Sequence, residues 1–186
     1  MKSRKSLMIV DPQVDFVNGS LPVDGAPEVM DKLAEYIAHN PDEYRLIIIT
    51  ADNHPDNHSS FKENGGEWPR HCVARSDGAS IVSPLLKALK VNDAPYVVLA
   101  KGEHPEVEEY SIFKNPIAAK KIVDLINEYD IDQIDVCGIA GDVCVYNTLT
   151  DAFNFLKGIK IKVLKQFCAS IDGGLRLNQL PDEIVL

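Results

Sequence analysis

Four side chains that could support catalysis lie at or shortly after the ends of apolar segments, namely Asp11, Asp52, Lys101 and Cys144. Taken singly, each has an ordinary explanation, because aspartate often caps helices and lysine is mostly exposed. Together they indicate one site, because ligand crevices in open α/β sheets form at the carboxyl ends of the strands. A thiol beside a carboxylate and an ammonium makes a nucleophilic triad. Asp11 could move the thiol proton while Lys101 stabilises the anions.

The nucleophile is expected to be Cys144, in the segment CGIAGDVCVYNTL. This pattern predicts a strand, a glycine-containing turn and a helix whose first turn holds the thiol. A helix amino terminus and a nearby cation both favour the thiolate. The alternative is a small core residue, the usual fate of a free cysteine, which we expect for Cys137 and Cys168. Cys72, next to a histidine, is ambiguous.

A second constellation, TADNHPDNH followed by WPRHC, has the residue types of a metal site. Asp52 and His54 are two apart at a strand end, so their side chains point to the same side. His71 could complete the set from the following loop. These oxygen and nitrogen ligands suit Zn²⁺ best, with Fe²⁺ or Mn²⁺ as alternatives, and three protein ligands leave positions open. His58 could be a fourth ligand or an outer hydrogen-bonding partner.

An alternating α/β framework is needed to bring these residues together. Apolar runs rich in Val and Ile predict buried strands at residues 6–10, 45–50, 96–100, 134–138 and 159–164. Helical patterns cover residues 27–39, 80–89, 116–129 and 144–156. The alternation predicts an α/β domain with a mostly parallel sheet. Residues 52–79 form an unusually long connection, which is typical of a functional loop, and the tail after Asp172 reads as a turn plus a last short strand.

Composition limits the classes of partner. The 186 residues carry 19 Lys+Arg and 28 Asp+Glu, a net charge of −9 with a pI near 5.0, which disfavours nucleic-acid binding. The length fits a single domain over 1–186, and no apolar run is long enough to span a membrane or form a signal peptide. The four cysteines form no CxxC pair, so we expect a cytoplasmic protein with free thiols. His39 and His104 are expected on the surface, and a homo-oligomer is left open.

The motifs resemble the nicotinamidase/pyrazinamidase branch of the isochorismatase-like cysteine hydrolases. IVDPQVDF is similar to the segment with the catalytic Asp, TADNHPDNHSSF and EWPRHCV to the metal-binding segments, EEYSIF after LAKG to the Lys segment, and GIAGDVCV to the nucleophile turn. These five motifs occur in the family's order between about residues 7 and 172.

The resemblance implies a three-layer α/β/α fold with a five- or six-stranded sheet, and hydrolysis of nicotinamide to nicotinate and ammonia, with pyrazinamide as a further substrate. It implies the triad Asp11, Lys101 and Cys144, and a divalent metal on Asp52, His54 and His71 that holds the ring nitrogen. It also implies a cis peptide between Ile139 and Ala140, an oxyanion hole from the N–H groups of Ala140 and Cys144, and a substrate pocket walled by Phe16, Trp68 and Tyr110.

Three departures from the family pattern stand out. Gly141 replaces a common Thr, which predicts a looser turn; ARSDGA, at residues 74–79, replaces a Gln-Gly-Thr-like stretch; and the short tail predicts a reduced or absent last helix. Two alternatives to a metal-dependent amidase therefore stay open. One is a metal-independent relative acting on another small amide or carbamoyl compound. The other is a thiol-bearing binding or redox protein, against which the lack of a closely spaced second cysteine counts.

Overall fold

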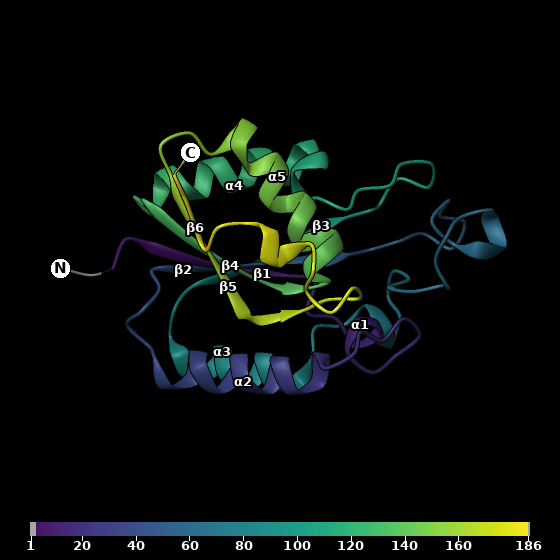
Figure 1. Cartoon of the computed structure of the whole chain (residues 1–186), viewed down its shortest axis with the longest axis horizontal. Helices are drawn as coiled ribbons and strands as arrows, with labels where there is room; N and C mark the ends of the chain where they lie inside the picture. Colours follow the sequence, from purple (N-terminus) through teal and green to yellow (C-terminus); the bar gives the residue numbers. More distant parts are fainter. Residues whose placement is uncertain (1–2, 186) are drawn as a thin grey trace.

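A six-stranded sheet forms the centre of the computed structural model, which describes residues 3–185 (Figure 1). The strands are β1 (Lys5–Val10), β2 (Leu46–Asp52), β3 (Tyr96–Lys101), β4 (Gln133–Ile139), β5 (Lys160–Ala169) and β6 (Glu183–Val185). Their order is β3-β2-β1-β4-β5-β6, with all pairs parallel except β5 and β6. The predicted mostly parallel sheet and the last short strand are confirmed.

Helices cover both faces of the sheet. The α-helices are α1 (Val14–Val17), α2 (Ala26–His39), α3 (Ser83–Asn92), α4 (Pro116–Glu128) and α5 (Tyr146–Phe155). Helices α2 and α3 lie on one face and α4 and α5 on the other, giving the expected three layers (Figure 1). Proline in the first turn of α2, α3 and α4 fits a position where a backbone N–H has no helical acceptor. Among the described helices the longest, α2, has 14 residues, and none could cross a membrane.

The apolar strand runs are explained by burial on both faces. Along β1, Leu7 and Ile9 pack toward α2 and α3, whereas Met8 and Val10 pack toward α4 and α5. Strand β2 follows the same alternation and is buried throughout. Successive strand residues point to opposite faces of the sheet. Because helices cover both faces, the strand sequences are apolar throughout and do not alternate between apolar and polar residues.

Two expected elements differ from the structure. Strand β3 is an edge strand within the described sheet, so Tyr96 and Val98 are 48% and 45% exposed, and the expectation of a buried strand there is wrong. The helix expected from residue 80 begins at Ser83, because Ile81 bridges Gln13 and the Val82 N–H donates to a loop carbonyl.

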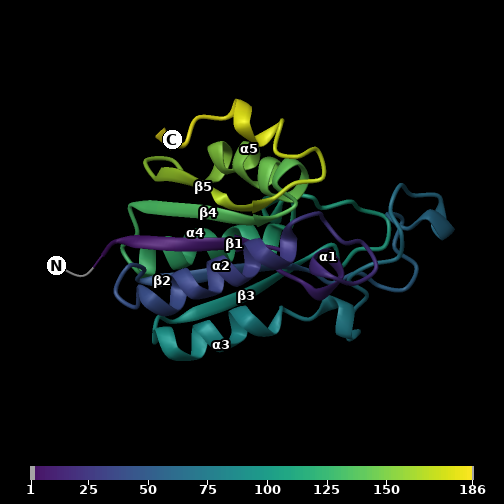
Figure 2. The ribbon, with the colours of Figure 1, turned by 60° about the horizontal axis from the view of Figure 1, so that its bottom comes forward.

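The long connection after β2 extends beyond the carboxyl ends of the strands and is internally paired (Figures 1 and 2). Isolated bridges join His54 to Val73 and Phe61 to Trp68. Arg70 forms ion pairs with Asp56 and Glu63, two carboxylates from the earlier part of the same loop. These contacts let a segment with little regular structure hold fixed side-chain positions beside the sheet edge.

Candidate active site

Asp11, Lys101 and Cys144 meet at the carboxyl edge of the sheet. Lys101 Nζ lies 2.9 Å from Asp11 Oδ2 and 3.7 Å from Cys144 Sγ, and a carboxylate oxygen of Asp11 lies within 4.8 Å of the thiol sulfur. All three side chains are buried. Asp11 has a left-handed backbone with φ of 48°, which is uncommon outside glycine and occurs preferentially at functional positions.

One ammonium serves two carboxylates, because Lys101 Nζ also lies 2.5 Å from Asp52 Oδ1. Burial lowers the pKa of Lys101, but Asp11 and Asp52 raise that pKa further, so the side chain stays charged. Burial raises the pKa of Asp11 against the opposing effect of Lys101. Burial likewise raises the pKa of Cys144 well above its usual value, despite Lys101. Burial of the thiol thus opposes the thiolate that the sequence favours, whereas the Lys101 ammonium supports it.

Residues that the sequence interpretation missed hold this geometry. Thr50 Oγ1 donates to Asp11 Oδ1 at 2.6 Å. Gln13 donates to the Asp52 carbonyl and accepts from the Asp52 N–H, both at 2.8 Å, and also donates to the Ala79 carbonyl. A signal was available in the sequence. Thr50 is a polar residue at the end of one predicted buried strand, and Gln13 is a polar residue shortly after another. Gln13 joins the triad segment, the end of β2 and the divergent 74–79 stretch.

Asp52, His54 and His71 form a cluster whose ligand atoms lie within 4.8 Å of one another. His54 Nδ1 contacts the Gly102 carbonyl at 2.9 Å, and His71 Nδ1 contacts the Pro69 carbonyl at 2.7 Å. If both Nδ1 atoms donate, each Nε2 has a free lone pair. Among the described residues, His54 Nε2 is buried without a hydrogen-bond partner and lies 3.6 Å from Asp52 Oδ2. An orphaned imidazole nitrogen beside a carboxylate fits a divalent metal ion.

The surroundings of His54 decide which other groups can join the cluster. Gly102 has φ of 69°, and a Cβ there would lie 2.4 Å from His54 Cε1, so only glycine permits this approach. His58 stacks on His54 with ring centroids 4.1 Å apart. Its nitrogens contact the Val107 carbonyl and the Ser60 N–H, both at 3.2 Å. The structure thus places His58 behind His54 as a supporting ring and outside the three-residue cluster.

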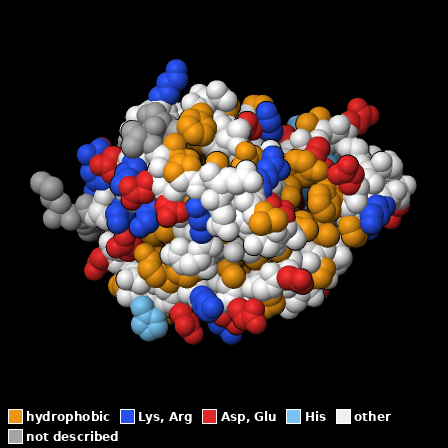
Figure 3. Space-filling model, in the orientation of Figure 1, with side chains coloured by type: hydrophobic (Ala, Val, Ile, Leu, Met, Phe, Trp, Pro, Cys, Tyr) orange, Lys and Arg blue, Asp and Glu red, His pale blue; other side chains and the backbone are white. Residues whose placement is uncertain are grey.

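A small cavity opens beside both groups. It is lined by Phe16, Leu21, Val23, Asp52, Trp68, His71, Glu108, Tyr110, Ala140, Val143, Cys144 and Ile171. Trp68 Nε1 donates to the Tyr110 hydroxyl at 3.0 Å, and the Phe16 ring lies 5.4 Å from that of His71. The empty space among these residues, including the part open to solvent, is about 390 Å³. Hydrophobic side chains also gather around a hollow on the side where the strands end (Figure 3).

The turn that carries the thiol is a five-residue π-helix, Gly141–Val145, preceding α5. Cys144 therefore lies before the α-helix, and the expected helix start at 144 is corrected to Tyr146. The peptide between Ile139 and Ala140 is cis, as the resemblance implies. A Cβ on Gly141 would lie 2.2 Å from Ser170 Oγ, so the turn is tightly packed and the expectation of a looser turn is wrong.

The segment after β5 is fixed to this turn. The Asp142 carboxylate accepts the N–H groups of Ile171 and Asp172 at 2.9 and 3.1 Å. Arg176 donates to the Asp142 carbonyl and covers the Tyr146 ring at 3.9 Å. Beyond it the described tail has only a three-residue 3₁₀ turn before β6, so the last helix is absent, as expected.

The remaining cysteines and histidines lie outside the triad and the three-residue cluster. Cys72 and Cys137 are buried, Cys168 is half-buried, and all are free thiols. His39 and His104 are exposed, as expected.

Comparison with known proteins agrees with this geometry. Residues 5–178 match the isochorismatase domain. The chain belongs to the isochorismatase family. It is 31% identical to the nicotinamidase of Escherichia coli, over 90% of this chain and 84% of that protein. It is 30% identical to the nicotinamidase/pyrazinamidase of Mycobacterium tuberculosis, over 96% and 93%. The predicted family is therefore confirmed.

Solved structures of relatives share the fold. The pyrazinamidase of Pyrococcus horikoshii in complex with zinc has a TM-score of 0.77 at 31% identity, with 95% of this chain and 93% of that one covered. PnC1 from L. infantum, in complex with nicotinate, has a TM-score of 0.80 at 29% identity, with 96% and 89% covered.

Proposed function

We propose that this family member hydrolyses nicotinamide to nicotinate and ammonia, and pyrazinamide by the same chemistry. The observation that carries the proposal is one small cavity that Cys144, the residue beside Asp11 and Lys101, lines together with Asp52 and His71 of the Asp/His/His cluster. Relatives with 30% identity or more that bear the names nicotinamidase and pyrazinamidase support the same substrate class.

The residues support a two-stage reaction through a thioester. Asp11 takes the thiol proton as Cys144 Sγ bonds to the carboxamide carbon. The N–H groups of Ala140 and Cys144 are assigned to the oxyanion, and Lys101 offsets the charge on Asp11. The C–N bond breaks and ammonia leaves with the proton from Asp11. Water, deprotonated by Asp11, then cleaves the thioester, releases nicotinate and restores the thiol.

The cluster of Asp52, His54 and His71 is assigned to a divalent ion, which we take to be Zn²⁺. When bound, the ion supplies a Lewis-acid contact for the ring nitrogen of the substrate. Phe16 and Trp68 are assigned to the faces of the pyridine ring, with Tyr110 supporting Trp68 through its hydroxyl.

The deciding experiment measures ammonia release from nicotinamide and the metal content of the same purified sample. We expect turnover together with about one equivalent of zinc. Ammonia release that persists after demonstrated metal removal would favour a metal-independent relative acting on another amide. If no amide releases ammonia, the result would favour the alternative of a thiol-bearing binding or redox protein.

We further assign residues 1–186 to one isochorismatase-like domain and place the protein in the cytoplasm, where its free cysteines would stay reduced. The charge of −9 supports a small-molecule enzyme without a nucleic-acid partner. A homo-oligomer is compatible with this assignment and is tested by light scattering.

A further inference from the structure

We propose that Glu108 selects ligands by charge, disfavouring the carboxylate product relative to the neutral carboxamide substrate. The inference rests on the proposed function and concerns a residue outside the triad and the metal cluster. Glu108 follows β3, is half-buried and lines the same cavity as Cys144 and Trp68.

The position of Glu108 differs from that of its neighbour Glu109. The Glu109 carboxylate is buried and accepts the Gly102 N–H at 2.7 Å and the Asn115 amide at 3.4 Å, so it holds the backbone after β3. Within residues 3–185 the Glu108 carboxylate, by contrast, accepts no hydrogen bond from a backbone N–H, and the residue lines the cavity. Its carboxylate is therefore available to the cavity.

The two carboxylates that line the cavity, those of Asp52 and Glu108, differ in whether a cation pairs with them. Asp52 also lines the cavity, but it lies 2.5 Å from the ammonium of Lys101. Glu108 forms no ion pair among residues 3–185.

The proposed reaction makes this charge relevant. It converts a neutral amide into a carboxylate without moving the ring, so the product is an anion held beside Glu108. Like charges in a partly water-excluded cavity repel more strongly than in bulk water. A fixed carboxylate in the wall therefore weakens product binding more than substrate binding, and favours release of the acid after each turnover.

The test compares equilibrium binding of nicotinamide and nicotinate by calorimetry in a zinc-loaded Cys144→Ala protein, which cannot turn over the amide. Adding Glu108→Gln should tighten nicotinate binding about tenfold relative to nicotinamide, equivalent to about 1.4 kcal/mol. Glu108→Asp, which keeps the charge, should preserve the original ratio. Glu106→Gln, an exposed position on the same segment, is the matched control and should also leave the ratio unchanged.

Each other outcome has a definite meaning. If Glu108→Gln changes both affinities by the same factor, or neither, Glu108 has no charge selectivity and the inference is wrong. Loss of zinc in Glu108→Gln would assign the residue to metal retention and also overturn it. If neither ligand binds the zinc-loaded Cys144→Ala protein, the proposed substrate is wrong, a failure distinct from an unchanged ratio.

Discussion

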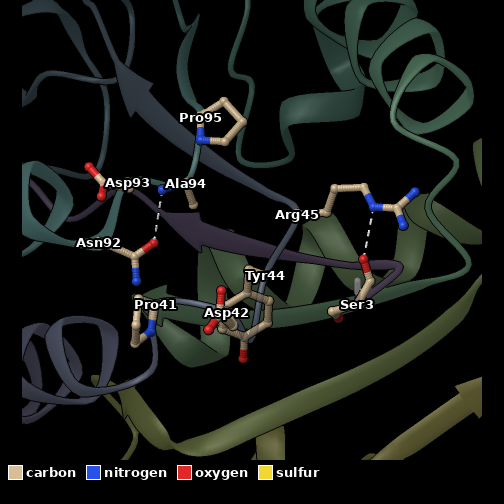
Figure 4. A pocket seen from close by; sticks show the side chains of 9 residues that line it. All are labelled: Ser3, Pro41, Asp42, Tyr44, Arg45, Asn92, Asp93, Ala94 and Pro95. Atoms are coloured by element: carbon tan, nitrogen blue, oxygen red, sulfur yellow. Dashed lines mark hydrogen bonds between the residues drawn. The ribbon is translucent and has the colours of Figure 1, made fainter. Parts of the chain in front are cut away.

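Two hollows open at opposite ends of the parallel sheet, and they differ in size and chemistry. The amino-end hollow, shown in Figure 4, is lined by Ser3, Pro41, Asp42, Tyr44, Arg45, Asn92, Asp93, Ala94 and Pro95. Its empty space, about 1130 Å³, exceeds the 390 Å³ of the cavity beside Cys144. Size alone would select the amino-end hollow as the binding site.

Three large polar side chains of the amino-end hollow, those of Tyr44, Arg45 and Asn92, have hydrogen-bond partners in the protein. Asn92 donates to the Ile37 carbonyl at 2.6 Å, and the Tyr44 hydroxyl donates to Asp135 at 2.9 Å. Arg45 donates to two backbone carbonyls. These bonds tie loops to the ends of strands, which is a structural use of polar groups.

The cavity at the carboxyl end, by contrast, lies beside reactive groups that do not serve as structural hydrogen-bonding groups. His54 Nε2 is buried and has no hydrogen-bond partner within residues 3–185, and two carboxylates share the Lys101 ammonium. The comparison teaches that unpaired, buried reactive groups identify a site better than volume does. Substitutions at the carboxyl end should thus act on turnover, and those at the amino end on stability.

The largest effect is expected from Cys144→Ala. Removing the nucleophile should reduce kcat for nicotinamide by at least about ten-thousandfold, because the thioester cannot form. Zinc content and the urea midpoint should stay close to the wild-type values, since the side chain is small and buried. Ammonia release, metal analysis and urea titration check the three points. Retention of more than a few per cent of activity would remove Cys144 from this role.

Lys101→Met should lower activity about a thousandfold and also destabilise the protein. Asp11 and Asp52 would be left buried without their shared cation, which typically costs about 3 to 5 kcal/mol. Loss of the ammonium should also raise the pKa of Cys144 further. Alkylation rates against pH measure this shift, and an unchanged profile would mean that Lys101 does not act on the thiol.

The metal cluster should control substrate choice. Nicotinamide and pyrazinamide carry a ring nitrogen in the meta position to the carboxamide, whereas benzamide does not. We expect kcat/KM for benzamide to be at least about a hundredfold lower, because an anchoring polar contact is lost. His54→Ala should shrink this gap by damaging the nicotinamide reaction selectively. Equal wild-type rates on both amides would contradict the assigned role of the ring nitrogen.

The residues at the strand ends could be predicted because apolar runs locate strands and parallel strands share one carboxyl edge. Asp11, Asp52 and Lys101 follow directly from that rule. The sharing of Lys101 by both carboxylates could not be predicted, since it depends on how far a side chain reaches across β2. Nor could the burial of Cys144, which raises the pKa of its thiol against the effect of Lys101.

The loop after β2 shows a different limit of sequence interpretation. Three of the five histidines lie within residues 54–71, but spacing alone does not say which of them meet. The answer depends on backbone turns such as the left-handed Cys72, with φ of 46°, and on backbone carbonyls that orient His54 and His71. His58 has the same chemistry and ends up behind the cluster.

Gly141 tests whether close packing at the carboxyl end supports turnover. Gly141→Thr would place a Cβ 2.2 Å from Ser170 Oγ, and overpacking of this kind costs about 1 to 3 kcal/mol. We expect lower stability together with reduced kcat, because the turn carries Cys144. Adding Ser170→Gly should recover part of both losses. Urea titration and ammonia release check this, and independent, additive effects would mean that the two residues do not clash.

The smallest effect is expected at the amino-end hollow, from Tyr44→Phe. Losing the bond to Asp135 should cost about 1 to 2 kcal/mol at pH 7.5, with kcat and KM unchanged. Burial, followed by Tyr36 and Asp135, raises the pKa of Tyr44. A pKa raised by folding contributes stability below the unfolded value, near 10 for tyrosine, and that stability is lost as the pH rises above it. The stability difference between wild type and Tyr44→Phe should therefore shrink between pH 9 and 11 in urea titrations. A difference that stays constant, or a fall in kcat comparable to that of the carboxyl-end variants, would break the distinction between the two hollows.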